Sequence, residues 1–149
     1  MTIKFSLHRI ALLVLLFTVV YSCEPDTANP DTSRTDYLGN WNGSSDGPIG
    51  GPLTFPMTIT ASNSASNQIL MDNFDAVGQG IKVIATVNGS TITIPQNIIA
   101  SDTISGSGSY RSDGSLSFSF TVRDGQTVDT RTATATDRKS TRLNSSHRT

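Results

Sequence analysis

The chain has 149 residues, about the length of a single domain, and it carries 11 basic and 12 acidic residues. Charged residues make up only 15% and aromatic residues 7% of the chain, whereas Ser, Thr and Gly are abundant. This composition excludes a highly charged disordered chain and favours strands and turns over helices.

The segment over 1–22 has the features of an export signal. Lys4, His8 and Arg9 provide a basic start, and the residues over 10–20 are apolar apart from one threonine. This apolar stretch has the length of a signal core and is shorter than a helix that spans a bilayer. We therefore predict that 1–22 directs export of the protein.

Cys23 is the sole cysteine, and it closely follows the apolar stretch. The segment resembles the signal of bacterial lipoproteins, in which such a cysteine is lipidated and becomes the first residue of the mature protein. This resemblance implies a lipid-anchored protein of the cell envelope, held at a membrane through Cys23. A plain secretory signal with an incidental cysteine is the alternative. The polar residues that follow predict a disordered tether over 23–36.

Alternation of apolar and polar residues predicts a series of antiparallel strands in the rest of the chain. In the second of them, Pro56 favours a position at a sheet edge or at a bulge. Asn-Gly and Asp-Gly pairs between apolar runs mark tight hairpins. The expected strands cover 37–43, 53–61, 68–74, 80–88, 91–95, 102–111, 115–123 and 127–136.

Eight sequential strands with short connections predict an all-β fold, a small antiparallel up-and-down β-barrel over 37–136. Such a barrel leaves no exposed sheet edge. A β-sandwich of two sheets fits the same strand spacing and is the alternative. No stretch after Cys23 shows a helical period.

The start of this barrel resembles lipocalin-like (calycin) proteins. Gly39-Asn40-Trp41 matches the Gly-x-Trp that opens the first strand in that family. The wider layout resembles small lipocalin-like lipoproteins of the Bacteroidetes, with an Asn-Phe pair at 73–74, an Ile-Pro step at 94–95 and a Gly-Ser-Gly strand at 106–108. The resemblance implies a lipoprotein of the outer membrane in which Trp41 plugs the closed end of the barrel.

Arg131 is the second residue that this resemblance assigns to closure of the barrel. In lipocalin-like proteins a late arginine packs its guanidinium across the Gly-x-Trp ring, so Arg131 is expected to stack on Trp41. Arg131 shares a strand face with Ala133 and Ala135, and it points inward if these alanines do. If Val128 marks the inward face instead, Arg131 is solvated.

The last residues break with the pattern of the domain. The residues over 137–147 do not alternate, and they read as the in-frame translation of a common short-read sequencing adaptor. We therefore predict that 137–149 is a non-native tail that contributes nothing to the fold.

The charged and reactive residues exclude several classes of function. Between Cys23 and Thr136 the chain has five basic and eleven acidic residues, a net charge of −6, which argues against nucleic-acid binding. Both histidines lie outside this range, which excludes a Ser-His-Asp or Cys-His catalytic site and a histidine-based zinc site. Asp72 and Asp75 are the remaining candidates for acid–base chemistry or for calcium ligands, although such residues commonly serve turns.

These observations predict a non-enzymatic protein without catalytic residues, a cofactor or a metal ion. The inward faces of the strands either fill the barrel or line a pocket for a small apolar ligand. The alternatives are a structural or adhesive accessory subunit of a surface complex, acting through loops such as 44–52, and a carboxylate-based enzyme. The candidate ligand-lining residues are Phe55, Met57, Ile59, Met71, Val83, Phe118 and Phe120.

Overall fold

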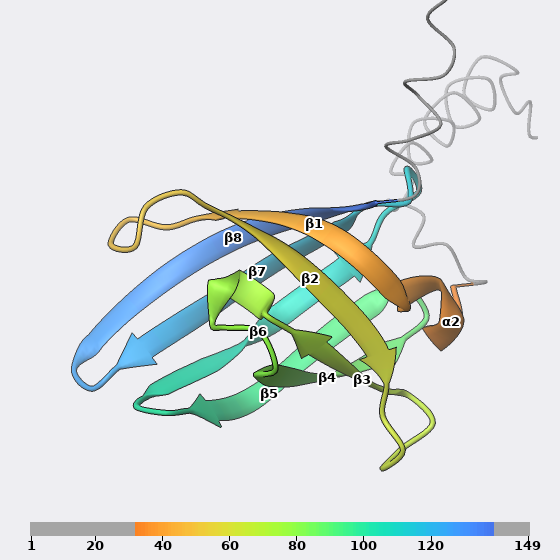
Figure 1. Ribbon diagram of the computed structural model, residues 1–149, viewed down its shortest axis with the longest axis horizontal. Helices are drawn as coiled ribbons and strands as arrows, with labels where there is room; N and C mark the ends of the chain where they lie inside the picture. The colour runs from red at the N-terminus through yellow and green to blue at the C-terminus, as the bar shows by residue number, and fades with distance from the viewer. Residues whose placement is uncertain (1–31, 139–149) are drawn as a thin grey trace, which may run out of the picture.

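A computed structural model of the protein describes residues 32–138, which form a closed barrel of eight antiparallel strands (Figure 1). The strands are β1 (Gly39–Asp46), β2 (Leu53–Ala61), β3 (Gln68–Asp72), β4 (Lys82–Asn88), β5 (Thr91–Ile99), β6 (Asp102–Tyr110), β7 (Leu116–Asp124) and β8 (Thr127–Asp137). A short helix, α2 (Arg34–Tyr37), precedes β1, and a 3₁₀ turn, η1 (Phe74–Ala76), lies between β3 and β4.

Each strand pairs with its neighbours in the chain, and the pairing of β1 with β8 closes the sheet. This closing ladder runs from Trp41 opposite Asp137 to Asp46 opposite Thr132. The up-and-down barrel predicted from the alternation is confirmed, and the sandwich alternative is excluded.

The interior of the barrel is built from the alternating apolar side chains of the strands. In β2, for example, buried and exposed residues alternate without a break from Thr54 to Thr60, because successive side chains of a strand point to opposite faces. The seven residues expected to face the interior are all buried, with at most 4% of their surface exposed: Phe55, Met57, Ile59, Met71, Val83, Phe118 and Phe120.

The connections between strands lie at two opposite ends of the barrel. One end, the α2 end, carries α2 and the connections over 62–67, 89–90 and 111–115. The other, the η1 end, carries the loop over 47–52, the segment over 73–81 with η1, and the turns at 100–101 and 125–126. In Figure 1 α2 lies at the right and the β1–β2 loop and β7–β8 turn at the left.

Pro56 lies at a local edge of β2, as its missing donor requires. The last pair between β2 and β3 joins Thr58 to Asp72, so β2 has no β3 partner at Pro56. The Pro56 carbonyl instead accepts a hydrogen bond from the Asn73 side chain, at 2.8 Å. The end of β2 is therefore tied to the segment that carries η1.

The ordered domain extends past both of its expected boundaries. Residues 34–37 form α2, which corrects the disordered tether over 34–36 and the expected start of the first strand at 37, since β1 begins at Gly39. One helical turn is too short to show a period in the sequence. At the other end, Asp137 belongs to β8 and the Arg138 amide donates to the Asn40 carbonyl at 3.0 Å. The first two residues of the predicted tail therefore belong to the fold.

The predicted signal over 1–22, the predicted lipidation residue Cys23 and the rest of the predicted tail over 139–149 lie outside the described residues. In the described part of the chain no helix has the length and apolar character needed to cross a membrane.

Candidate functional site

Phe74 occupies the mouth of the barrel at the η1 end. Its side chain is fully buried, and its ring centroid lies 4.8 Å from that of Phe120, 5.1 Å from Phe118 and 6.2 Å from Phe55. Tilted and edge-on contacts at such distances are the favourable arrangements of aromatic rings. Phe74 therefore acts as an apolar stopper supplied by a connecting segment rather than by a strand.

Two glycines of β6 make room for this aromatic cluster. Gly106 and Gly108 pair with Phe120 and Phe118 across the β6–β7 ladder. A Cβ atom on either glycine would collide with the phenylalanine opposite and with the β7 backbone. The Gly-Ser-Gly segment of the sequence is thus the surface against which the two phenylalanines pack.

Arg131 lies beside this cluster, directly opposite Phe120 across the β7–β8 ladder. Only 3% of its surface is exposed. Its Nη1 donates to Asp129 Oδ2 at 2.9 Å, and its Nη2 donates to Ser45 Oγ at 3.2 Å and to the Gly51 carbonyl at 3.0 Å. Its Nε lies 3.1 Å from Asp75 Oδ2, in an ion pair. One guanidinium thus joins β1, the β1–β2 loop, η1 and β8.

Asp129 fixes the β1–β2 loop over the same mouth. Its two carboxylate oxygens accept the backbone amides of Ile49, at 3.3 Å, and Gly50, at 2.9 Å. The absence of a side chain at Gly50 is required, because a Cβ atom there would collide with the Arg131 guanidinium. The β1–β2 loop, Asp129 and Arg131 are therefore joined to one another by hydrogen bonds.

The two carboxylates beside Arg131 differ in their protonation equilibria. Burial raises the pKa of Asp75 above its ordinary value, and the Ser45 hydrogen bond, 2.5 Å long, and the Arg131 charge only partly offset it. Burial also acts to raise the pKa of Asp129. This effect is outweighed by the hydrogen bonds from the Gly50 amide, the Arg131 guanidinium and the Ile49 amide, so the pKa of Asp129 is lowered. Asp129 is therefore the better-stabilised anion.

The segment that carries Phe74 has an unfavourable backbone. Asn73, Asp75 and Ala76 all have positive φ angles, of 60°, 55° and 61°. Such left-handed conformations cost roughly 1–3 kcal/mol each when the surrounding structure imposes them, with Asn and Asp at the low end. The Asn73 side chain holds the turn in place with two hydrogen bonds. Its amide nitrogen donates to the Pro56 carbonyl, and its oxygen accepts from the Gly78 amide at 3.0 Å. Tertiary contacts, not local preference, keep η1 in the mouth.

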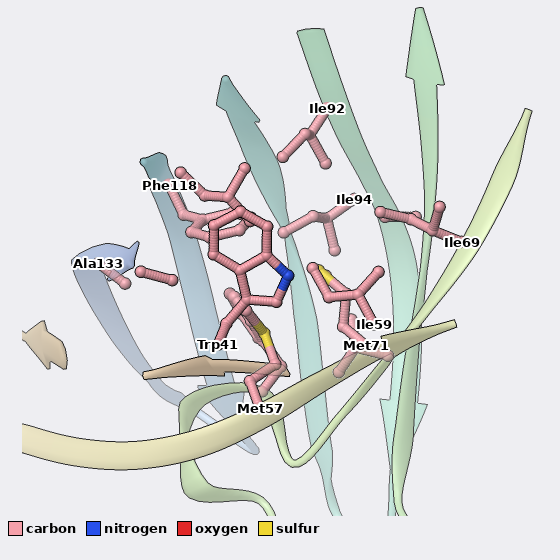
Figure 2. Close-up of a cluster of buried hydrophobic side chains, with 14 of the residues drawn as sticks. Trp41, Met57, Ile59, Ile69, Met71, Ile92, Ile94, Phe118 and Ala133 are labelled. Carbon is pink, nitrogen blue, oxygen red and sulfur yellow. The ribbon is translucent and has the colours of Figure 1, made fainter. Parts of the chain in front are cut away.

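Aromatic side chains close the opposite, α2 end. Trp41 is 2% exposed, and its Nε1 donates to the Tyr37 carbonyl at 2.9 Å. Figure 2 shows its indole inside the barrel among the apolar side chains of the core. The Tyr37 hydroxyl donates to the Gly89 carbonyl at 2.7 Å. Burial, and then the charge of Asp36, raises the pKa of Tyr37 to about 12.

The expected stacking of Arg131 on Trp41 is wrong. Trp41 pairs with Asp137, and Arg131 precedes Asp137 by six positions on β8, which corresponds to about 20 Å along the strand. Arg131 does point inward and does close the barrel, but at the other end and with carboxylate partners. Val128 does not mark the inward face, since it is 40% exposed whereas Asp129 is buried.

The structure also separates the two candidate acid–base residues. The Asp72 carboxylate accepts the Gly80 amide at 2.8 Å and faces an open outer groove of about 600 Å³. Asp75 turns into the mouth toward Arg131. The carboxylates that do converge are Asp75 and Asp129, and Ser45 joins them. Asp129 had a visible sequence signal, since it shares the inward face of Arg131. Phe74 was visible only as half of the Asn-Phe pair at 73–74, without a role, and Ser45 had no signal.

The geometry at the η1 end is therefore that of a buried, internally paired ionic cluster beside an apolar stopper. Among the described residues no three side chains of the metal-binding types gather into one cluster. Comparison with known proteins finds neither a protein-family model nor a curated protein that matches this chain.

Proposed function

We propose that this protein is an exported lipoprotein, anchored to the outer membrane through Cys23, whose barrel binds a small apolar molecule without chemical conversion. The observation that supports binding is the way in which the barrel is closed at the η1 end. The interior is apolar along its strands, and the η1 mouth is occupied by Phe74 on a strained turn. A stopper of this kind can leave while the strand ladders stay paired.

The exposed apolar side chains support the same end as the point of access. In the described part of the chain the large apolar residues with substantial exposure gather near the η1 end: Ile49, Ile81, Ile84, Ile98 and Val128. Exposed apolar side chains at this end favour the approach of an apolar molecule. The α2 end, by contrast, is covered by Tyr37 and Trp41.

Native mass spectrometry of the protein purified from the expressing cell tests the binding. We expect a co-purifying small molecule that is released when the protein unfolds. A protein of bare polypeptide mass that also takes up no apolar compound would contradict the proposal.

The Cys23→Ser variant tests the anchor. Firm membrane attachment requires more than one acyl chain, and only Cys23 can carry the lipid that the signal implies. We expect the variant to move from the membrane fraction to the soluble fraction and to lose the acyl mass of the mature N-terminus. Unchanged fractionation would show that membrane attachment does not depend on Cys23.

A structural or adhesive subunit of a surface complex is the second candidate function. It is favoured by Ile49, which is 61% exposed and belongs to a loop that Asp129 holds in one conformation. A rigid loop that presents an apolar side chain suits contact with another protein. The Ile49→Ser variant would abolish capture of a partner in this case, whereas it would leave the uptake of an apolar compound largely unchanged.

A further inference from the structure

Arg131 retains a donor that the protein itself does not satisfy. Its Nη1 and Nη2 donate to Asp129, Ser45 and Gly51, but its Nε–H finds no acceptor in hydrogen-bond geometry. Asp75 Oδ2 lies 3.1 Å from this nitrogen, close enough for an ion pair, but the Nε–H is not aligned with it. A buried donor without an aligned acceptor is costly, because it has lost its bonds to water.

Asp75 is a poorly adapted partner for this guanidinium in two further respects. It reaches Arg131 only from a left-handed backbone conformation, with φ of 55°. Its environment also disfavours its charge, since burial raises the pKa of Asp75. A carboxylate that was free to move could align with Nε without the left-handed backbone that Asp75 requires.

Phe74 precedes Asp75 directly, so the turn presents a carboxylate next to an apolar group. The carboxylate lies on Arg131, and the ring lies in the mouth against Phe118 and Phe120. We infer that the turn over 73–76 occupies the binding site of a carboxylate-bearing amphiphile, with Asp75 in the place of its head group and Phe74 in the place of its chain.

This inference rests on the proposed function and narrows its ligand to a class. The second carboxylate, Asp129, remains at the site and would repel a doubly charged head group, which favours a monoanionic carboxylate over a phosphate. The space that Phe74 would vacate is that of one ring, and Met57 and Met71 are the adaptable side chains of the interior. A short alkyl chain therefore fits this space better than a long one.

Titration calorimetry with hexanoate and 1-hexanol tests the inference on the full-length protein. The two probes share their chain length, and only hexanoate carries the carboxylate. We expect Asp75→Asn to tighten hexanoate binding about tenfold, because the internal competitor for Arg131 is removed, and to leave 1-hexanol binding unchanged. Asp124→Asn removes the same charge from an exposed position at the same end and is expected to change neither affinity.

Phe74→Ala provides an independent second variant. It vacates the apolar part of the site and keeps the carboxylate, so we expect it to tighten the binding of both probes by a similar factor. Circular dichroism establishes that each variant is folded.

The possible failures distinguish the two proposals. If both probes bind and Asp75→Asn does not change the ratio of their affinities, the assignment of Asp75 and Arg131 to the head group is wrong and the apolar-ligand function stands. If the unaltered protein and both folded variants fail to bind both probes, the apolar-ligand function and the head-group assignment are both wrong.

Discussion

The α2 end of the barrel is closed by Trp41 and Tyr37, whose polar atoms bond to backbone carbonyls. The η1 end is closed by Phe74 on a strained turn and by Arg131, which forms ion pairs with Asp75 and Asp129. The first closure uses residues of the first strand and its adjoining helix, so it is continuous with the fold. The second combines Asp129 and Arg131 of β8 with Phe74 and Asp75, which a connecting segment supplies. The two ends therefore differ in origin: the α2 end is closed by neighbours in the chain, whereas the η1 end is closed by residues brought together from distant positions.

Replacement of Trp41 tests the α2 end. We expect Trp41→Ala to lower the free energy of unfolding by about 3–5 kcal/mol, the usual cost of removing a large aromatic side chain from a core. Urea denaturation followed by circular dichroism measures it. Phe74→Ala serves as the matched change at the other end, and it should cost less because the strained turn is released. Equal costs would show that the turn stores no strain.

Replacement of Arg131 tests the charged end. We expect Arg131→Ala to cost about 3–5 kcal/mol, because Asp75 and Asp129 would be left buried without their cation. The same denaturation experiment measures it. Arg123, which is exposed on β7, provides the control, and its replacement by alanine should be close to neutral. A small effect for Arg131→Ala would indicate that the carboxylates reach water.

Alkaline pH should loosen the α2 end through Tyr37. Its pKa of about 12 in the folded protein exceeds the ordinary value of 10.0, so the folded state holds this proton more tightly than the unfolded state does. The resulting stability is fully present below about pH 10 and is lost as the pH rises toward 12. We expect Tyr37→Phe to weaken this alkaline loss in thermal denaturation. Burial also raises the pKa of Tyr110, so Tyr110→Phe should weaken the alkaline loss as well. An unaltered pH profile in Tyr37→Phe would contradict the assignment.

A glycine at position 76 should relieve strain at the η1 end. Ala76 has φ of 61°, a conformation that glycine adopts freely, so we expect Ala76→Gly to stabilise the protein by roughly 0.5–1 kcal/mol. Ala61→Gly is the matched control within β2, where the same change should destabilise the strand. A loss of stability at both positions would show that the backbone at Ala76 carries no strain.

The two ends should contribute independently. In a double-mutant cycle with Trp41→Phe and Arg131→Lys, we expect a coupling energy within about 0.5 kcal/mol of zero, because the residues lie far apart on the barrel and share no partner. Stacking of Arg131 on Trp41 would instead give a coupling of about 1 kcal/mol or more. Denaturation of the four proteins under one condition gives the coupling.

The strands and their inward faces could be predicted from the sequence because alternation is a local property. Phe55, Met57 and Ile59 face the interior as their spacing requires. The burial of Trp41 followed from a resemblance, and the structure confirms it. Local pattern therefore accounts for the barrel, whereas the α2 end depended on the resemblance for Trp41, and its helix was not predicted.

The charged cluster could not be predicted in the same way, because it depends on the register of several strands. Ser45 and Asp75 are thirty positions apart in the chain, and Asp75 reaches the mouth only because left-handed residues turn the backbone inward. No sequence period encodes such a turn. The spacing of Asp129 and Arg131 on one inward face was the part of the cluster that was visible.

The ladder between β1 and β8 has a consequence for how the chain folds. The other strand pairs join neighbours in the chain, whereas this one joins residues such as Gly43 and Ala135, about 90 positions apart. Loop-closure entropy makes such a contact the slowest to form, so closure of the ring is expected to be the last step of folding. A circular permutant, with its ends joined and a new opening in the turn over 111–115, would convert this long-range step into a local one. It would reach the same barrel by a different order of events.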